Sequence, residues 1–290
     1  MKIALIDSGL GLLAAAAAVR RARPDVSLVL SGDPDGMPWG PRAPRDIAER
    51  ALRCARAALA HGPHALVVAC NTASVHALEA LRTELEPAVP VVGTVPAVKP
   101  GAMAGGPLAI WATPATTGSV YQRRLIAEFA GGVETAEVPC HGLADAVERA
   151  DPAAITRAVD AAARLTPPGV RDVVLGCTHY ELVAATIRDR LTEAIGAPVR
   201  LHGSARAVAA QVLRRAGTVG GGVPADRGGT GGDGRLVVLA SGRPSTLSPA
   251  ALGYAEAALL LGPPTGVPAG AARNDGDEGG SGTREETAAV

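Results

Sequence analysis

The stretch Ala65-Leu66-Val67-Val68-Ala69-Cys70-Asn71-Thr72 decides the fold, and Asp172-Val173-Val174-Leu175-Gly176-Cys177-Thr178-His179 repeats its pattern. Each is a short apolar run that stops at a cysteine and is followed by small polar residues and a helical pattern. A continuous apolar run of this length, bounded by breakers, is typical of a strand buried on both faces of a parallel sheet. We therefore expect each cysteine between the carboxyl end of a strand and the amino end of a helix. Open α/β sheets bind ligands there, and the helix end favours a thiolate.

Strands and helices alternate on both sides of these two stretches. Further strands are predicted at 2–6, 26–30, 89–92, 107–112, 133–138, 199–201 and 236–240. Helices are predicted at 12–23, 45–61, 72–85, 119–129, 152–165, 181–195, 205–215 and 248–261, with a Gly-rich flexible loop at 217–234. Because the order restarts after about residue 100, we predict two pseudo-symmetric, doubly wound α/β lobes with mainly parallel sheets.

The composition fits a globular protein that binds a small molecule. A chain of 290 residues can bury a core, and at ~150 residues per domain it suggests about two domains. With 28 basic and 28 acidic residues, a net charge of +0 and 2% aromatics, it lacks the basic field and the stacking surfaces of a nucleic-acid-binding protein. No apolar run approaches the ~20 residues of a membrane helix, and the amino terminus enters a strand without a signal-peptide layout. Four cysteines in so long a chain do not form a disulfide framework, so we expect a cytoplasmic protein. From the charge, the aromatic content and the apolar runs we expect neither a nucleic-acid nor a membrane partner.

Two thiols in matching positions suggest one cleft with a sulfur on each wall, which could move a proton between the two faces of a substrate carbon. Inert buried thiols are the alternative, since free cysteine packs as a small hydrophobe. A metal site that adds His76 and His179 to the two sulfurs is disfavoured because His76 falls within a helix, not at a strand end. Cys54, on a helix, is predicted to lie in the core, and Cys140, at the start of a loop, stays undecided.

The turn Asp7-Ser8-Gly9-Leu10-Gly11 after the first strand has two interpretations. The spacing Gly9-x-Gly11-x-x-Ala14 fits a loose dinucleotide fingerprint, with Asp33 placed for a ribose contact. An NAD-dependent oxidoreductase is therefore an alternative function. Otherwise the carboxylate of Asp7 could hold a substrate ammonium group or tune a nearby thiol.

Short polar side chains at the strand ends suit a small zwitterionic substrate, although each could instead cap a helix. They are Ser8, Thr113, Thr116 and Thr117. Glu148 and His179 are candidate proton-handling partners of Cys70 and Cys177 respectively. A thiol with a pKa near ~8.5 needs neighbouring charge before it can take a proton from carbon.

At these residues the sequence resembles the glutamate racemases of the aspartate/glutamate racemase superfamily, over about residues 3–204. The motifs that carry the resemblance are Ile6-Asp7-Ser8-Gly9, Pro38-Trp39-Gly40, Ala69-Cys70-Asn71-Thr72-Ala73, Val95-Pro96-Ala97-Val98-Lys99-Pro100, Ala112-Thr113-Pro114-Ala115-Thr116 and Leu175-Gly176-Cys177-Thr178-His179, with a fainter match at Ala240-Ser241-Gly242. The paired cysteine motifs are specific, and the others support order and spacing. The histidine after Cys177-Thr178 favours glutamate over aspartate as the substrate.

The resemblance implies a cofactor-independent racemisation of glutamate, in which Cys70 acts on one face of the α-carbon and Cys177 on the other. Asp7 would assist Cys70, and His179 with Glu148 would assist Cys177. The residues implied to hold the substrate are Asp7, Ser8, Trp39, Gly40, Asn71, Thr72, Thr113, Thr116, Thr178 and His179. The implied product, D-glutamate, goes into peptidoglycan, and the resemblance also suggests a homodimer.

The implied fold has its active site between the lobes, with the last strand and helix returning to the first lobe. We expect a first lobe at 1–98 plus 208–261, a second lobe at 99–207 and a disordered tail at 262–290. The sequence departs from the family at Leu12, where glycine is usual, at Trp39, where tyrosine is usual, and at His141, where proline is common. A racemase of aspartate or another small acid, and a catalytically silent binding protein, remain as alternatives.

Overall fold

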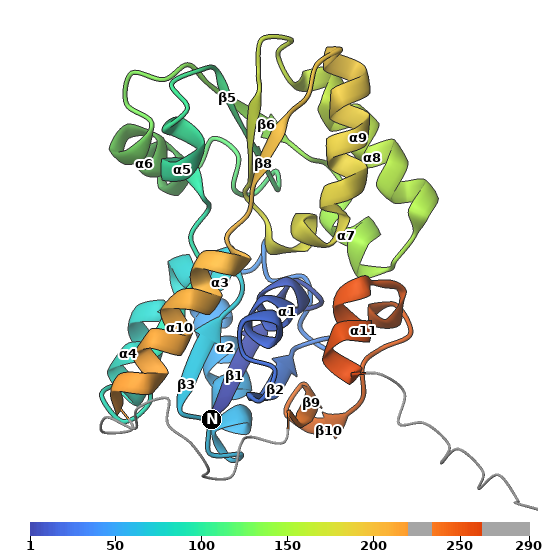
Figure 1. Ribbon diagram of the computed structural model, residues 1–290. Helices are drawn as coiled ribbons and strands as arrows, with labels where there is room; N and C mark the ends of the chain where they lie inside the picture. The colour runs from blue at the N-terminus through green and yellow to red at the C-terminus, as the bar shows by residue number, and fades with distance from the viewer. Residues whose placement is uncertain (220–233, 263–290) are drawn as a thin grey trace, which may run out of the picture.

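The structure, a computed structural model, describes residues 1–219 and 234–262, and its strands form two sheets (Figure 1). The first sheet has the order β10-β9-β2-β1-β3-β4. Its strands are β1 (Lys2–Asp7), β2 (Ser27–Gly32), β3 (Ala65–Val68), β4 (Val91–Gly93), β9 (Leu236–Ala240) and β10 (Arg243–Ser245). The second sheet has the order β6-β5-β7-β8, with β5 (Leu108–Ala112), β6 (Thr135–Pro139), β7 (Asp172–Leu175) and β8 (Arg200–His202).

The two sheets repeat one topology. In each, the first strand of the unit lies between the second and the third, and the fourth lies outside the third. The strand pairs are parallel except β9–β10, which is antiparallel. The prediction of two similar, mainly parallel α/β units is therefore confirmed, and β3 and β7, which precede the two cysteines, are equivalent strands.

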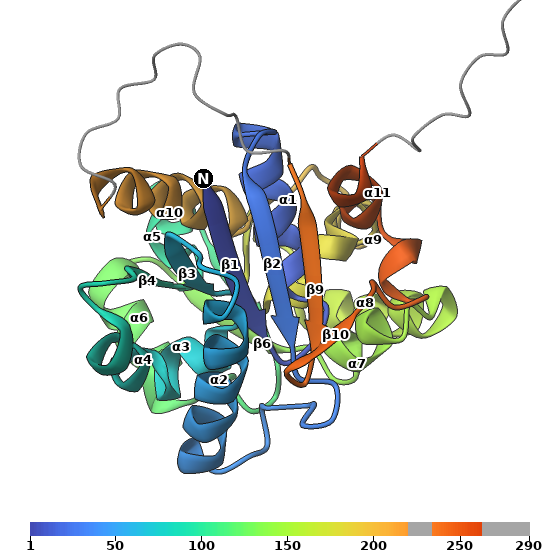
Figure 2. The same cartoon turned by 90° about the horizontal axis from the view of Figure 1, so that it is seen from below.

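Helices cover both faces of the first sheet, as Figure 2 shows from below. Helices α1 (Leu12–Ala22), α10 (Ala205–Val219) and α11 (Ala255–Leu261) pack on one face, and α2 (Pro44–Leu59), α3 (Asn71–His76) and α4 (Leu78–Leu85) pack on the other. Along β1, Ile3 and Leu5 face the first group while Ala4 and Ile6 face the second. Successive strand side chains point to opposite faces, so a strand buried on both sides carries an uninterrupted apolar run.

The second sheet is covered in the same way. Helices α7 (Leu143–Glu148), α8 (Pro152–Leu165) and α9 (Ala184–Ile195) pack on one face, and α5 (Val98–Ala102) and α6 (Val120–Phe129) on the other. The chain leaves the first sheet between β4 and α5 and returns to it between β8 and α10 (Figure 1). Two crossing segments therefore join the halves that carry Cys70 and Cys177.

Several predicted elements differ from the observed ones. The predicted helix 72–85 is two helices that meet at Ala77, whose backbone leaves the helical region. A 3-10 helix, η1 (Thr178–Val183), precedes α9, and another, η2 (Ala251–Gly253), replaces the start of the predicted helix 248–261. Helix α10 runs into the predicted loop 217–234, most of which lies outside the described residues, as does the predicted tail 262–290 apart from its first residue.

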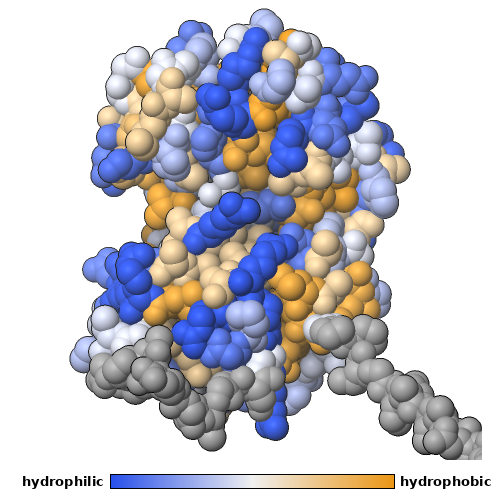
Figure 3. Space-filling view, in the orientation of Figure 1, coloured by the Kyte–Doolittle hydropathy of each residue, from blue (hydrophilic) through white to orange (hydrophobic). Residues whose placement is uncertain are grey.

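The described surface is mixed in character. On the face shown in Figure 3, hydrophilic and hydrophobic residues are interspersed over both lobes. Within residues 1–219 and 234–262, no helix has both the length and the hydropathy needed to span a bilayer.

Candidate functional site

A pocket of about 320 Å³ lies where the carboxyl ends of strands from both sheets meet. Parallel strands bring their carboxyl ends to one edge, and two equivalent sheets facing each other therefore enclose a site from both sides. Its lining residues are Ser8, Met37, Pro38, Trp39, Gly40, Pro41, Cys70, Asn71, Thr72, Thr113, Pro114, Ala115, Thr116, Cys140, Gly142, Ala144, Asp145, Glu148, Gly176, Cys177, Thr178 and His179. All the site residues that the resemblance implied line it except Asp7. Thr117, also suggested by the sequence, does not line it, and its hydroxyl donates to the carbonyl of Thr113 at 3.1 Å.

The two cysteines have nearly the same local geometry. Cys70 has φ −136° and ψ 123° and is followed by α3, while Cys177 has φ −134° and ψ 135° and is followed by η1. In each half, the residue before the cysteine donates its N–H to the end of the first strand, Ala69 to Ile6 (2.8 Å) and Gly176 to Trp111 (2.7 Å). The repeat therefore presents the two thiols to the same pocket in equivalent ways.

Asp7, at the end of β1, lies next to Cys70 but behind the pocket wall. Its side chain is fully buried, and its Oδ1 accepts a hydrogen bond from the backbone N–H of Ser8 at 2.6 Å. Burial raises the pKa of Asp7 to about 6, although the nearby charge of His179 opposes the shift. The equivalent position at the end of β5 is Ala112, so the second half has no matching carboxylate beside its cysteine.

The helix end affects the pKa of Cys70 less than burial and a neighbouring charge do. Burial raises the pKa of the Cys70 thiol well above its usual range, and the negative charge of Asp7 raises it further. The backbone N–H of Ala73 at the start of α3 lowers this pKa, as predicted for a helix end, but the other two effects outweigh it. The physical reason is that a helix of six residues offers only a short dipole against desolvation and an adjacent carboxylate.

Cys177 has a different partner. Its Sγ lies 3.8 Å from Nδ1 of His179, and Nε2 of His179 lies 2.8 Å from Oε2 of Glu148. Burial alone would lower the pKa of His179, but its hydrogen bonds with Cys177 and Glu148 and the charge of Asp7 raise this pKa well above 6.5. The raised pKa favours the protonated imidazole, which would place positive charge beside the sulfur of Cys177.

Glu148 is held by both halves of the molecule. Its Oε2 also accepts the backbone N–H of Leu10, in the loop after β1, at 2.8 Å. A side chain on Gly9 would collide with Glu148, and one on Gly11 would reach His179 Nδ1 at 2.8 Å and collide with Thr178 and Asp7. The two glycines therefore let this loop approach the second lobe closely.

The dinucleotide interpretation of this loop is wrong. The space over Gly9 and Gly11 holds Glu148, Thr178 and His179, which leaves no room for a pyrophosphate. Asp33, the expected ribose partner, is buried, and its carboxylate accepts hydrogen bonds from Trp39 and Arg50.

The pocket lining contains hydroxyl groups and backbone amides but no lysine or arginine. Thr113 and Thr116 share a hydrogen bond between their hydroxyls at 3.2 Å. Asn71 is buried, and its Oδ1 has no hydrogen-bond partner among the described residues. A small ligand with carboxylate and ammonium groups would meet mostly neutral donors and acceptors here, beside the ring of His179 and the carboxyl groups of Asp145 and Glu148.

Some lining residues were not found from the sequence. Met37 and Pro41 flank the Pro-Trp-Gly motif, and Gly142, Ala144 and Asp145 lie between Cys140 and Glu148. Each stands on a loop or short helix, and only proximity to a motif could have indicated it.

The remaining cysteines and His76 have clear positions. Cys140 is buried and lines the pocket, and burial raises its pKa. Cys54 lies in the core as predicted, and burial raises its pKa to about 12. His76 ends α3 and does not line the pocket. Among the described residues no group of three or more His, Cys, Asp or Glu side chains is arranged to hold a metal ion.

Comparisons with known proteins agree on one family. Residues 10–212 match the family described as Asp/Glu/Hydantoin racemase. A glutamate racemase from Roseiflexus sp. is 37% identical over 191 residues, which is 64% of this chain and 70% of the relative. One from Pseudomonas putida is 36% identical over 220 residues, 74% of this chain and 81% of the relative.

Solved structures give the same result. The Escherichia coli glutamate racemase, in complex with L-glutamate and the activator UDP-MurNAc-Ala, superposes with a TM-score of 0.69 at 26% identity, covering 87% of this chain and 91% of that one. The Thermus thermophilus glutamate racemase, in complex with beta-chloro-D-alanine, superposes with a TM-score of 0.60 at 28% identity, covering 90% and 93%.

Proposed function

Since this chain belongs to the Asp/Glu/Hydantoin racemase family, we propose that it interconverts L-glutamate and D-glutamate without a bound cofactor, by proton transfer through Cys70 and Cys177. One observation supports this most strongly: two cysteines with matching backbone conformations, at the ends of equivalent strands, line one pocket. Because these relatives are named glutamate racemase, we propose glutamate and not aspartate as the substrate of this chain.

In the proposed reaction one sulfur, as a thiolate, takes the α-proton from one face of the substrate and becomes a thiol. The electron pair of the broken C–H bond stays on the substrate as a planar carbanion. The other sulfur, as a thiol, gives its proton to the opposite face and becomes a thiolate. The stereocentre is thereby inverted, and the reverse reaction exchanges the two roles.

Because the two sulfurs have different surroundings, we expect them to differ in protonation state before the substrate binds. Burial and then the carboxylate of Asp7 raise the pKa of Cys70, which favours its thiol form. His179, held by Glu148, lies 3.8 Å from the sulfur of Cys177, and its raised pKa favours positive charge at that point. After the L-to-D reaction Cys70 is a thiolate and Cys177 is a thiol, so the starting state returns when Cys70 gains a proton and Cys177 releases one to solvent. Because Asp7 has a pKa of about 6, it can relay the proton from solvent to Cys70 near neutral pH.

We assign substrate binding to the polar groups of the pocket wall. These are Ser8, Asn71, Thr72, Thr113, Thr116 and Thr178, the ring of His179, and the backbone at Trp39 and Gly40. The unpaired Oδ1 of Asn71 suits the substrate ammonium group. Asp7 was expected to contact the substrate too, but it lies outside the lining, so we keep it only as the partner of Cys70.

The test is a chiral assay on purified protein without added pyridoxal phosphate. The unchanged protein should convert L-glutamate to D-glutamate, and aspartate in parallel tests the sibling activity. Cys70→Ser and Cys177→Ser should each lose about 10²–10⁴-fold in rate, because an alcohol is a far weaker acid than a thiol and is not ionised near neutral pH. Cys54→Ala, a buried cysteine away from the pocket, is the matched control. Near-full activity in either serine variant would contradict the proposal.

The cellular setting belongs to the same proposal. We place the enzyme in the cytoplasm, where D-glutamate would supply peptidoglycan synthesis, and we expect a homodimer, which analytical ultracentrifugation can test. The lobe boundaries 1–98 plus 208–261 and 99–207 stay a prediction, for which limited proteolysis is the measurement.

A further inference from the structure

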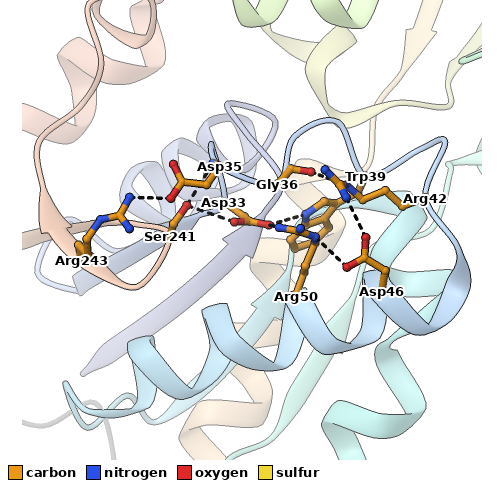
Figure 4. Close-up of polar contacts among 9 residues, drawn as sticks. All are labelled: Asp33, Asp35, Gly36, Trp39, Arg42, Asp46, Arg50, Ser241 and Arg243. Carbon is orange, nitrogen blue, oxygen red and sulfur yellow. Dashed lines mark hydrogen bonds and ion pairs between the residues drawn. The ribbon is translucent and has the colours of Figure 1, made fainter.

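Asp33 is a buried carboxylate that the reaction does not use. It follows β2 and is 5% exposed. Its Oδ2 accepts the indole N–H of Trp39 at 2.9 Å and a guanidinium N–H of Arg50 at 3.0 Å, and its Oδ1 accepts the hydroxyl of Ser241 at 3.2 Å. Figure 4 shows the three donors converging on it from the loop before α2, from α2 and from the turn between β9 and β10. One carboxylate therefore joins three separate segments.

The loop between β2 and α2 forms one wall of the pocket. Its residues 37–41 all line the cavity. The side chain of Trp39 is nevertheless 1% exposed and belongs to the apolar cluster that includes Ile47 and Ala51 of α2. The indole therefore anchors the loop in the core of the first lobe, and its single polar atom is satisfied by Asp33.

Two further contacts hold the same loop. Arg42 donates to the carbonyl of Gly36 at 2.6 Å and to Asp46 at 2.8 Å, and Asp46 also accepts from Arg50 at 3.0 Å. These bonds tie the loop to the first turns of α2 (Figure 4). Arg50 links the two groups of contacts because it donates to both Asp33 and Asp46.

The turn between β9 and β10 supplies further contacts to Asp33 and to the loop that follows it. Ser241 and Gly242, both with positive φ (47° and 80°), form the two-residue turn between β9 and β10, a conformation that suits an antiparallel hairpin. The Ser241 hydroxyl donates to Asp33 and accepts the N–H of Asp35 at 3.2 Å. Arg243 then pairs with Asp35 at 2.7 Å. A positive φ is uncommon for serine. Here it directs the Ser241 hydroxyl toward Asp33, behind the loop that forms the pocket wall.

We propose that Asp33 is a positioning residue for substrate binding: through the indole of Trp39 it fixes the wall formed by residues 37–41. Asp33 is not among the lining residues and does not touch the reacting groups. Losing it should therefore weaken substrate binding while the two sulfurs keep their rate. The proposal rests on the proposed racemase function, and the unchanged protein in the same assay tests that function separately.

The experiment compares KM and kcat for glutamate in a set of variants. Asp33→Leu has a similar size and no acceptor, and Trp39→Phe keeps an aromatic ring without the N–H. Each should raise KM about tenfold, the effect of one hydrogen bond to a charged group, with kcat within about twofold. The double variant should match Asp33→Leu, because both changes break the same bond.

Asp33→Asn is the conservative rescue. Its amide oxygen can accept from Trp39, and its amide N–H can donate to the Ser241 hydroxyl, so KM should return to within about threefold of the unchanged protein. If Asp33→Leu fails to fold, Trp39→Phe and Asp33→Asn carry the test.

Asp172→Asn is the matched control for general destabilisation. Asp172 is also buried at a strand, 1% exposed, and pairs with Arg200 at 2.6 Å and with His202 at 2.8 Å in the second lobe, away from the pocket. This variant should lose thermal stability with an unchanged KM. An unchanged KM in Trp39→Phe, or independent effects that multiply to about 100-fold in the double variant, would overturn the proposal.

Discussion

The side-chain amide of Asn71 donates a hydrogen bond of 2.9 Å to the backbone carbonyl of Gly176. Asn71 follows Cys70 in the first lobe, and Gly176 precedes Cys177 in the second. The bond therefore joins the two cysteine turns directly, across the pocket that both of them line. Because each sulfur is one residue away from this bond, it fixes their relative positions more closely than packing between the lobes alone.

Asn71→Ala tests this link. The buried carbonyl of Gly176 loses its donor, which should cost about 1–3 kcal/mol of stability. The turnover number should fall about 10²-fold, because a displacement of about 1 Å between reacting groups has that effect. Gln122→Ala is the control, since Gln122 is also a buried amide, bonded to the backbone of Gly118 within one lobe. If both variants keep the full rate, the bond does not align the sulfurs.

Asp7→Asn should stabilise the protein and reduce its activity. The pKa of Asp7 rises from 3.8 to about 6 on folding, so its stabilising contribution is complete below 3.8 and is lost as pH rises through 6. The difference corresponds to roughly 3 kcal/mol. At pH 8 the variant should therefore be more stable than the unchanged protein by up to about 3 kcal/mol, and the gap should close below pH 4.

Denaturant unfolding between pH 4 and pH 8 measures this effect. Asp172→Asn provides the contrast, since the hydrogen bond from Arg200 holds the pKa of Asp172 below its usual value despite burial. That variant should be less stable than the unchanged protein at pH 8. A destabilised Asp7→Asn at pH 8 would show that the buried carboxylate contributes to folding and carries no cost at neutral pH.

Glu148→Gln should lower the pKa of His179. The hydrogen bond from the imidazole to the Glu148 carboxylate is one of the contacts that raise this pKa, and a neutral amide stabilises the imidazolium less. A proton NMR titration of the ring, assigned with His179→Asn, follows the change. The racemisation rate should fall at least about tenfold. An unchanged titration would mean that Glu148 does not raise the pKa of His179, and the prediction would be wrong.

The stretches around Cys70 and Cys177 were sufficient to predict the repeat, since a strand buried on both faces needs an uninterrupted apolar run. Strand β10 was missed because its three residues, Arg-Pro-Ser, are all exposed and leave no alternating hydrophobic pattern. The break at Ala77 gave no signal either, because alanine favours a helix and only the observed backbone shows the interruption. Local sequence thus predicts buried elements better than exposed strands and short breaks.

Some residues in and around the pocket could also be predicted from the sequence, and others could not. Residues that follow strands, such as Cys70, Thr113 and Cys177, could be placed from the pattern because topology brings strand ends together. Asp33 was correctly placed at a strand end but given the wrong partner. Its contact with Ser241 joins residues separated by 208 positions, and no local pattern carries that information.

Racemisation of L-glutamate in deuterium oxide tests the central claim, that two sulfurs act on opposite faces of one carbon. Each thiol holds a single hydrogen, and the thiol that reprotonates the carbanion carries solvent deuterium. Mass spectrometry of the earliest product should therefore find D-glutamate with deuterium at the α-carbon, while unreacted L-glutamate keeps its hydrogen. Early D-glutamate that retains the hydrogen of the substrate would mean that one group serves both faces, and the account would be wrong.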